Sequence, residues 1–372
     1  MSVPQTVETP TSTWRRVLAG RTTIDFVGGR RRWFTISAVL IGIALAGLAL
    51  RGGLNLGLEF RGGLAVETIN PAGAGIPELR DALEAVGEPD ARIQLIDDGA
   101  AVLIQTEPVS ADTQEALVEA VAAVTGSPRS EISIESVGPT FGAIVARRAL
   151  EALVVFLAAA IVFISWRLEW KMAVAGITAL FHDLVITLGV YAITGFEVTP
   201  ATVVAVLTIL GYSLYDTVVV FDKVEELEAS MGDQHTITDI VNRAMNQVLV
   251  RSINTSLTSL LPVGSLLFVG SFILGAASLR DFALALFVGI AAGTYSSIFV
   301  AAPMLGAWKE NEEEWAAQRQ RLERRAHKAR QQAARLASQA EEARAAKEAK
   351  TSAPPRPGQL RPPKKRKKKR RR

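Results

Sequence analysis

The sequence predicts a membrane protein with a bundle of six transmembrane helices and one folded α+β domain outside the membrane. Hydrophobic residues make up 49% of the 372 residues and charged residues 21%, so lipid-exposed and water-exposed parts must coexist. Six windows are apolar over enough residues to cross a bilayer as a helix, which takes about 20 residues. The stretch 51–147 instead has the pattern of a soluble domain.

The six predicted spans are long apolar runs bounded by polar or charged residues. They are 33–50, 148–166, 172–194, 201–221, 247–269 and 282–308. The first run follows arginines and could be a secretory signal peptide. Its length and the five later spans favour an uncleaved first span.

Positive charges in the short flanks orient the spans, because Lys and Arg collect on the cytoplasmic side. The arginines before the first span are Arg15, Arg16, Arg21, Arg30, Arg31 and Arg32. They predict a cytoplasmic N-terminal segment, 1–32. Alternation then places the links 167–171 and 222–246 and the C-terminus inside, and 195–200 and 270–281 outside.

The outer domain, 51–147, reads as strand, helix, strand, strand, helix, strand. The predicted strands are 64–69, 92–96, 101–106 and 131–137, and the predicted helices are 76–86 and 111–124. This order is the ferredoxin-like arrangement. Gly62 and Gly63 are expected to let the chain turn between the membrane and the first strand.

The formal charge of +4 is unevenly placed. Eleven of the 41 basic residues lie in 351–372. The other 30 are fewer than the 37 acidic residues, so the rest of the chain has a net negative charge. A solvated helix is predicted over 309–350 and a disordered polybasic tail over 351–372. The tail could lie near anionic lipid headgroups, contact RNA or a ribosome, or stay in solvent.

Three ionisable residues inside the spans are candidates for function: Asp183, Asp216 and Arg251. Such a residue is disfavoured by about 2.5 to 3.5 kcal/mol near the centre of a span, so it usually faces the bundle interior and a partner. The fourth and fifth spans are antiparallel, which puts Asp216 and Arg251 at similar depths. The two could therefore pair.

Polar neighbours at helical spacing extend this pair into a predicted polar seam. They are Tyr212, Ser213, Thr255 and Thr258. The seam could be a proton relay in which Asp216 binds and releases a proton beside Arg251, or an interhelical clamp that never titrates. His182 precedes Asp183, but adjacent residues on a helix point about 100° apart, so the two are not expected to pair with each other.

No enzyme site is predicted. The chain has no cysteine, which excludes disulfides, zinc thiolates and thiol nucleophiles, and its three histidines are scattered. No phosphate-binding glycine loop and no serine nucleophile beside a base appears. We therefore expect no cofactor and no metal.

Several motifs together resemble the SecF family of protein translocase subunits over about 33–305. They are Asn-Leu-Gly-Leu-Glu-Phe-Arg-Gly-Gly at 55–63, Val-Gly-Pro at 137–139, Ala-Leu-Phe-His-Asp at 179–183, the segments 211–222 and 251–259, Asp-Phe at 281–282, and Gly-Thr-Tyr-Ser-Ser at 293–297. Glu59 stands where many members carry Asp, and the tail is longer and more basic than in typical members.

The resemblance implies half of a twelve-span, RND-like assembly that a SecD-like membrane subunit completes in the bacterial cytoplasmic membrane. It implies that Asp216 and Arg251 match charged positions implicated in proton conduction. Further partners would be a SecYEG-type channel and secretory preproteins, whose late translocation the proton motive force would promote. Two alternative functions also fit the sequence. One is an RND-type exporter of lipids or small molecules, and the other is a scaffold whose buried charges only fix helix register.

Overall fold

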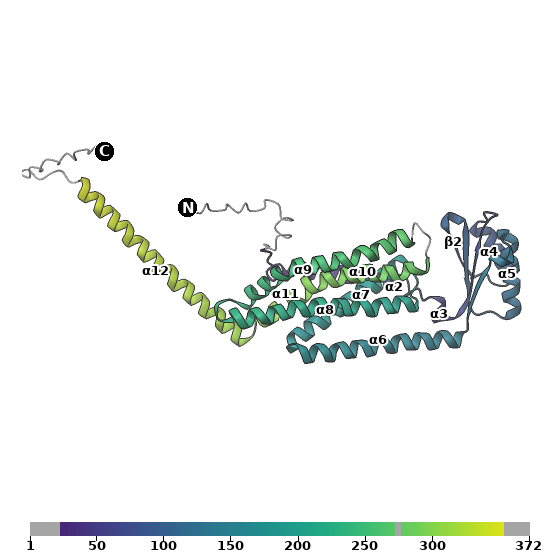
Figure 1. Cartoon of the computed structure of the whole chain (residues 1–372), viewed down its shortest axis with the longest axis horizontal. Coiled ribbons are helices and arrows are strands. Elements are labelled where there is room, and N and C mark those ends of the chain that lie inside the picture. The colour runs from purple at the N-terminus through teal and green to yellow at the C-terminus, as the bar shows by residue number, and fades with distance from the viewer. Residues whose placement is uncertain (1–22, 272–276, 353–372) are drawn as a thin grey trace, which may run out of the picture. The chain divides into compact units, whose positions relative to one another are not determined.

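The computed structural model describes residues 23–271 and 277–352, and six of the described helices are long and apolar enough to cross a membrane (Figure 1). They are α2 (Arg30–Leu50), α6 (Pro139–Arg167), α7 (Trp170–Thr194), α8 (Pro200–Met231), α9 (Ile237–Ser265), and α10 (Ala277–Ser296) with its continuation through the π-helical turn η5 (Ser297–Ala301) into α11 (Ala302–Lys309). Six long apolar helices are thus found where the sequence predicts six spans.

Helices α6 and α8 are longer than their predicted spans. Helix α6 begins at Pro139 rather than 148, and α8 continues to Met231 through much of the segment expected to be a loop. Hydropathy detects only the part of a helix that lies in lipid, so its polar ends escape notice. Gly195 caps α7 in the left-handed conformation, and Thr199 caps α8 by accepting a hydrogen bond from the Thr202 amide.

The centre of the bundle is formed by α7, α8 and α10. About half of the most apolar stretch is buried in each of them, against 11% in α2 and in α6. Small residues let these helices approach closely. A Cβ atom at Gly289 of α10 would lie only 1.9 Å from Ile209 Cδ1 of α8. Polar side chains on the facing surfaces of these three helices are therefore removed from lipid.

The outer domain is a four-stranded sheet covered by two helices. Its elements are β1 (Gly63–Ile69), α4 (Ile76–Ala85), β2 (Arg92–Ile96), β3 (Ala101–Thr106), α5 (Ala111–Thr125) and β4 (Ser133–Val137). The strand order is β2-β3-β1-β4, and all neighbouring strands are antiparallel. Strand β4 starts two residues later than predicted, because 129–131 form a short 3₁₀ turn.

The domain core lies between one face of the sheet and the two helices. Register pairs Val66 with both Ile104 and Ile134, so these side chains share a face. The core combines Leu64, Val66, Val102 and Ile104 from the sheet with Leu79, Leu83, Leu117 and Val121 from α4 and α5. The alternation in the sequence thus corresponds to buried and open faces.

The chain enters the domain through α3 (Leu58–Arg61) and the glycine pair Gly62 and Gly63. Both glycines have positive φ, at +78° and +144°, which explains the turn predicted from sequence. The entry segment is also tied to the turn between α7 and α8. The Gly57 amide donates to the Val198 carbonyl at 2.9 Å, and the Val198 amide donates to the Asn55 carbonyl at 2.7 Å.

Replacing Gly63 with alanine is expected to destabilise the sheet. The new Cβ would lie 2.2 Å from the Thr106 carbonyl oxygen in addition to the strain of positive φ. We expect a cost of at least about 2 kcal/mol, which corresponds to roughly 30-fold faster hydrogen exchange of β1 and β3 amides in the detergent-solubilised chain. Gly73→Ala is the control, because Gly73 has φ +68° with open space around it. Equal exchange in both variants would contradict the prediction.

Helix α12 covers Glu313–Ser352. From Ala316 onward it forms the described part of a second compact unit. Nearly all of its described side chains beyond Ala316 are exposed, which agrees with the solvated helix expected there. The polybasic segment beyond Ser352 and the arginines Arg15, Arg16 and Arg21 lie outside the described residues, so the predictions made for them stay predictions.

Candidate functional site

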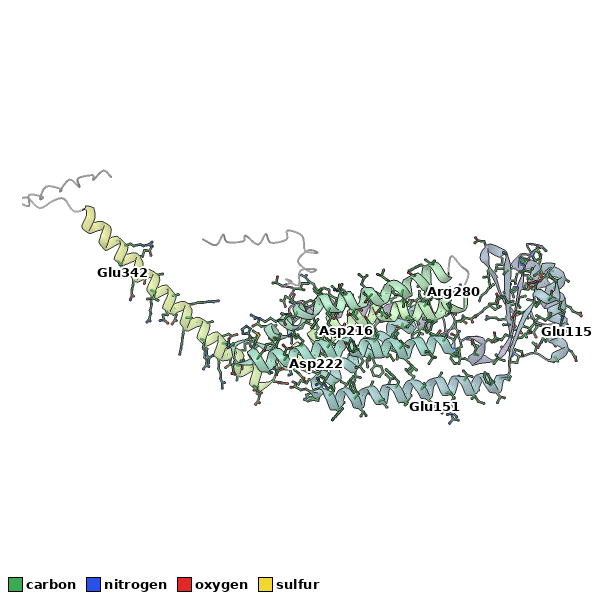
Figure 2. All side chains as sticks on the ribbon, in the orientation of Figure 1. Glu115, Glu151, Asp216, Asp222, Arg280 and Glu342 are labelled. Carbon is green, nitrogen blue, oxygen red and sulfur yellow. The ribbon has the colours of Figure 1, made fainter. Side chains whose placement is uncertain are left out.

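Asp216 lies on the inner face of α8, in the core of the bundle (Figure 2). The Ser252 hydroxyl of α9 donates to Asp216 Oδ1 at 2.9 Å. Asp216 Oδ2 is buried and has no hydrogen-bond partner among the described residues. One carboxylate oxygen is therefore held by a neighbouring helix, while the other is available to carry a proton.

Asp183 is the centre of a second buried cluster, which joins α7, α8 and α10. Asp183 Oδ2 accepts from the hydroxyls of Ser213 at 2.5 Å and Ser296 at 2.8 Å. The structure thus brings together Asp183 and Ser213, both predicted as site residues. Ser213 lies one turn before Asp216 on α8, so both residues are on the same face of that helix. The Asp183 carboxyl group, which Ser213 contacts from α7, therefore lies on the side of α8 that carries Asp216.

His182 Nδ1 lies 3.1 Å from Asp183 Oδ1, although these neighbours were not expected to pair. That expectation was wrong. The angle of about 100° between adjacent positions describes where side chains leave the helix, and both of these side chains are long enough to bend toward each other. Both are also buried, so neither can turn to water instead.

Arg251 does not pair with Asp216 in this structure. Its guanidinium is exposed and donates to the Tyr215 hydroxyl at 2.9 Å, and no nitrogen–oxygen contact of 4 Å or less joins it to Asp216 among the described ion pairs. The face of α9 that meets Asp216 passes through Ser252, one position further along. Successive residues on a helix lie about 100° apart around its axis, so Arg251 points outward when Ser252 faces Asp216.

The predicted seam is therefore divided between two faces. Thr255 and Thr258 share the outward face of Arg251, and their hydroxyls donate to main-chain carbonyls of α9 itself. Tyr212 is half-buried on α8. The outward group of Tyr215, Arg251, Thr255 and Thr258 is called the polar strip below.

Several hydroxyl residues of the buried face were not named as site residues from sequence. Ser256 Oγ lies 2.6 Å from Thr294 Oγ1, and Thr217 Oγ1 lies 2.8 Å from Ser297 Oγ. Ser252 and Ser296 donate directly to the two carboxyl groups, and these further pairs add buried hydroxyls on α8, α9, α10 and η5. The run Gly-Thr-Tyr-Ser-Ser at 293–297 could have signalled Thr294, Ser296 and Ser297, since it packs hydroxyls into one turn that leads into the π-helical turn η5.

Gly293 brings α10 close enough to α8 for these contacts. A Cβ atom at this position would lie 2.9 Å from Ser213 Cβ. The Ser213 hydroxyl is therefore held between Gly293 and Asp183 by close helix packing.

The buried site can hold and pass protons, because carboxyl and hydroxyl groups both donate and accept hydrogen bonds. Among the described residues, no group of three or more His, Cys, Asp or Glu side chains could hold a metal ion. What distinguishes the site is a set of ionisable groups at membrane depth, which is a mark of function in membrane proteins.

Comparisons with known proteins agree on one family. The family described as protein export membrane protein SecD/SecF, C-terminal, matches residues 117–311. The chain is 41% identical to protein translocase subunit SecF of Streptomyces coelicolor, over 82% of each chain. It is 40% identical to the SecF of Mycobacterium tuberculosis, over 80% of this chain and 70% of that one.

A solved structure is also similar. The crystal structure of SecDF, a translocon-associated membrane protein from Thermus thermophilus, superposes with a TM-score of 0.69 at 34% identity. The match covers 78% of this chain and 39% of that chain, so this chain spans about two fifths of the SecDF length. The family and the six apolar helices make this a multi-pass protein of the bacterial membrane. By sequence over most of its length, the chain belongs to the SecD/SecF family of protein export membrane proteins, among its SecF subunits.

Proposed function

We propose that the protein is a non-catalytic accessory subunit of the Sec export machinery. With a SecD-like partner, it uses the proton motive force to promote late stages of preprotein translocation through a SecYEG-type channel. The observation that carries the proposal is Asp216, a carboxyl group inside a span with one oxygen held by Ser252 and the other unpartnered among the described residues. A proton that crosses 100 mV delivers about 2.3 kcal/mol, enough to bias a conformational equilibrium.

The relay in this proposal consists of Asp216, Arg251 and Asp183, with Ser213 beside them. Asp216 takes up a proton in one conformation and releases it in another, in which Arg251 approaches. Tyr212, together with Thr255 and Thr258 of the polar strip, lines the route between the buried carboxyl groups and Arg251. Both termini lie in the cytoplasm, and protons move toward that side.

The polar strip is the surface that the SecD-like partner covers. An exposed guanidinium within a span is costly against lipid, and the Tyr215 hydroxyl is the one hydrogen-bond partner of the Arg251 side chain among the described residues. Leu257 and Leu261 extend the same side of α9 and are also exposed. A partner helix that brings a carboxylate to Arg251 would remove this cost and complete an RND-like bundle.

The outer domain, 51–147, is proposed to belong to the ferredoxin-like class, on the basis of its element order and its strand order β2-β3-β1-β4. It moves as the relay cycles, hinged at Gly62 and Pro139. The main chain at these two residues is in close contact, since a Cβ atom at Gly62 would lie 2.8 Å from Pro139 Cα. The remaining proposed divisions are 1–32, the spans 33–50 and 148–308, the helix 309–350 and the tail 351–372.

The test is preprotein export into membrane vesicles with and without a proton gradient, in the presence of the partner. Arg251→Met is expected to lose most of the gradient-stimulated share of export, and Arg251→Lys to keep part of it, because lysine preserves the charge without the planar guanidinium. Co-purification with the partner should be weakened in Arg251→Met but not lost, because the rest of the covered surface is unchanged. If Arg251→Met instead abolishes co-purification, or if export keeps its full response to the gradient, the charge serves as a clamp and the proposed function is wrong.

A further inference from the structure

On α7, Asp183 of the relay contacts His182, and these two buried side chains have different surroundings. His182 is 4% exposed and Asp183 is 1% exposed, and His182 Nδ1 faces Asp183 Oδ1 at 3.1 Å. We propose that His182 is the proton carrier of this span and that Asp183 is a fixed carboxylate that orients it, positioned by Ser213 and Ser296. The inference rests on the proposed function and assigns separate roles within it.

Asp183 is surrounded by donors. Ser213 and Ser296 donate to Oδ2, and His182 Nδ1 can donate to Oδ1. The Ser296 hydroxyl also lies 3.2 Å from the Gly293 carbonyl, so its hydrogen is shared between two acceptors. An ionised carboxylate is a pure acceptor and satisfies all three groups at once. Asp183 is therefore suited to stay ionised while a neighbour exchanges the proton.

His182 has the opposite arrangement. Its Nδ1 is committed to Asp183, while its Nε2 is buried and has no hydrogen-bond partner among the described residues. Buried polar atoms are almost always satisfied, so an unpartnered one requires a reason. A ring nitrogen that gains and loses a proton in the working cycle supplies that reason.

The ring of His182 is also held in place from its other side. It stacks on the Tyr295 ring of α10, with 5.8 Å between centroids and 26° between planes. The Tyr295 hydroxyl in turn donates to the Trp33 carbonyl at 3.0 Å and accepts from Ser37 at 3.2 Å. Tyr295 is thereby fixed against α2, and the imidazole contacts both this ring and the Asp183 carboxylate.

The chemical step is a simple proton exchange. Neutral His182 carries its hydrogen on Nδ1, which donates to Asp183. Uptake of a proton from water forms the second N–H bond at Nε2 and gives an imidazolium beside a carboxylate, a stable pair within a buried site. Release breaks that same N–H bond and returns the proton to water. Among the described residues, the titratable groups in contact with the ring are Asp183 on α7 and Tyr295 on α10, and the Ser37 hydroxyl of α2 donates to Tyr295.

The direct test observes the imidazole in the assembled complex. The chain has three histidines, and a His235→Gln/His327→Gln background leaves His182 as its only one. With ¹⁵N-histidine in this chain and an unlabelled partner, solid-state NMR in bilayers reports both ring nitrogens between about pH 5 and pH 8. We expect Nδ1 to stay protonated throughout and Nε2 to titrate. An Nε2 that keeps one protonation state over this range would overturn the proposal.

The functional test uses gradient-dependent export. His182→Gln keeps polar atoms near Asp183 but cannot titrate, and we expect the gradient-stimulated share of export to fall at least tenfold. The His235→Gln/His327→Gln chain should export normally. If His182→Gln keeps the gradient response while Asp216→Asn loses it, the role of His182 is wrong and the proposed function stands. If both variants keep it, the proposed function itself has failed.

Discussion

Replacing Asp216 with asparagine is expected to abolish the gradient-stimulated share of preprotein export and to leave the gradient-independent share intact. Asparagine has nearly the same shape and still offers an oxygen to the Ser252 hydroxyl, which lies 2.9 Å from Asp216 Oδ1. It cannot ionise. The change therefore removes proton exchange while it preserves packing, and a driving force of about 2.3 kcal/mol per proton at 100 mV, roughly a 40-fold bias, is lost.

Asp222→Asn is the matched control on the same helix. Asp222 lies six residues further along α8 and pairs with Arg167 at 2.8 Å, with both side chains more than two fifths exposed. A pair of this kind contributes about 1 kcal/mol or less, so export should keep its gradient response. The prediction fails if Asp216→Asn exports like the wild type under a gradient, or if both variants lose the response together.

The spans and the elements of the outer domain could be predicted because their signals are local. A run of about 20 apolar residues has few alternatives to a membrane helix, and alternation in β1 and β3 marks which side chains face α4 and α5. The ends of the helices were harder to predict. The polar turns of α8 between 222 and 231 carry no hydropathy signal, although nothing in them breaks a helix before Gly232.

The carboxyl groups of the site could also be predicted, because Asp183 and Asp216 are costly wherever a span places them. Their partners could not. A rotation of about 100° decides whether Arg251 or Ser252 meets Asp216, and periodicity does not determine helix rotation to that precision. Contacts such as Ser296 with Asp183 join residues more than 100 positions apart, so they depend on which helices are neighbours in the bundle.

Lys309 is another residue whose partners could not be predicted from the sequence. Its ion pairs also lead to the second large expected effect. The sequence places it just after the last span, as the first residue of a charged segment. In the structure its side chain is 2% exposed, and Nζ lies 2.6 Å from Glu169 Oε2 and 2.9 Å from Glu228 Oε2. The lysine thus joins the start of α7 and the end of α8 to the end of α11.

Removing the two carboxylates is expected to be far more damaging than removing the lysine. Glu169→Gln/Glu228→Gln leaves a buried ammonium without a negative partner, which typically costs about 3 to 5 kcal/mol. Lys309→Met leaves two carboxylates whose side chains are 51% and 24% exposed, so water can solvate them and the cost is smaller. Thermal unfolding of the detergent-solubilised chain should rank the double variant lowest. Lys223→Met, which removes an exposed pair with Glu226 on α8, should stay near the wild type. A double variant as stable as Lys223→Met would mean that Lys309 is solvated in the detergent-solubilised protein and that its burial does not hold these three helix ends together.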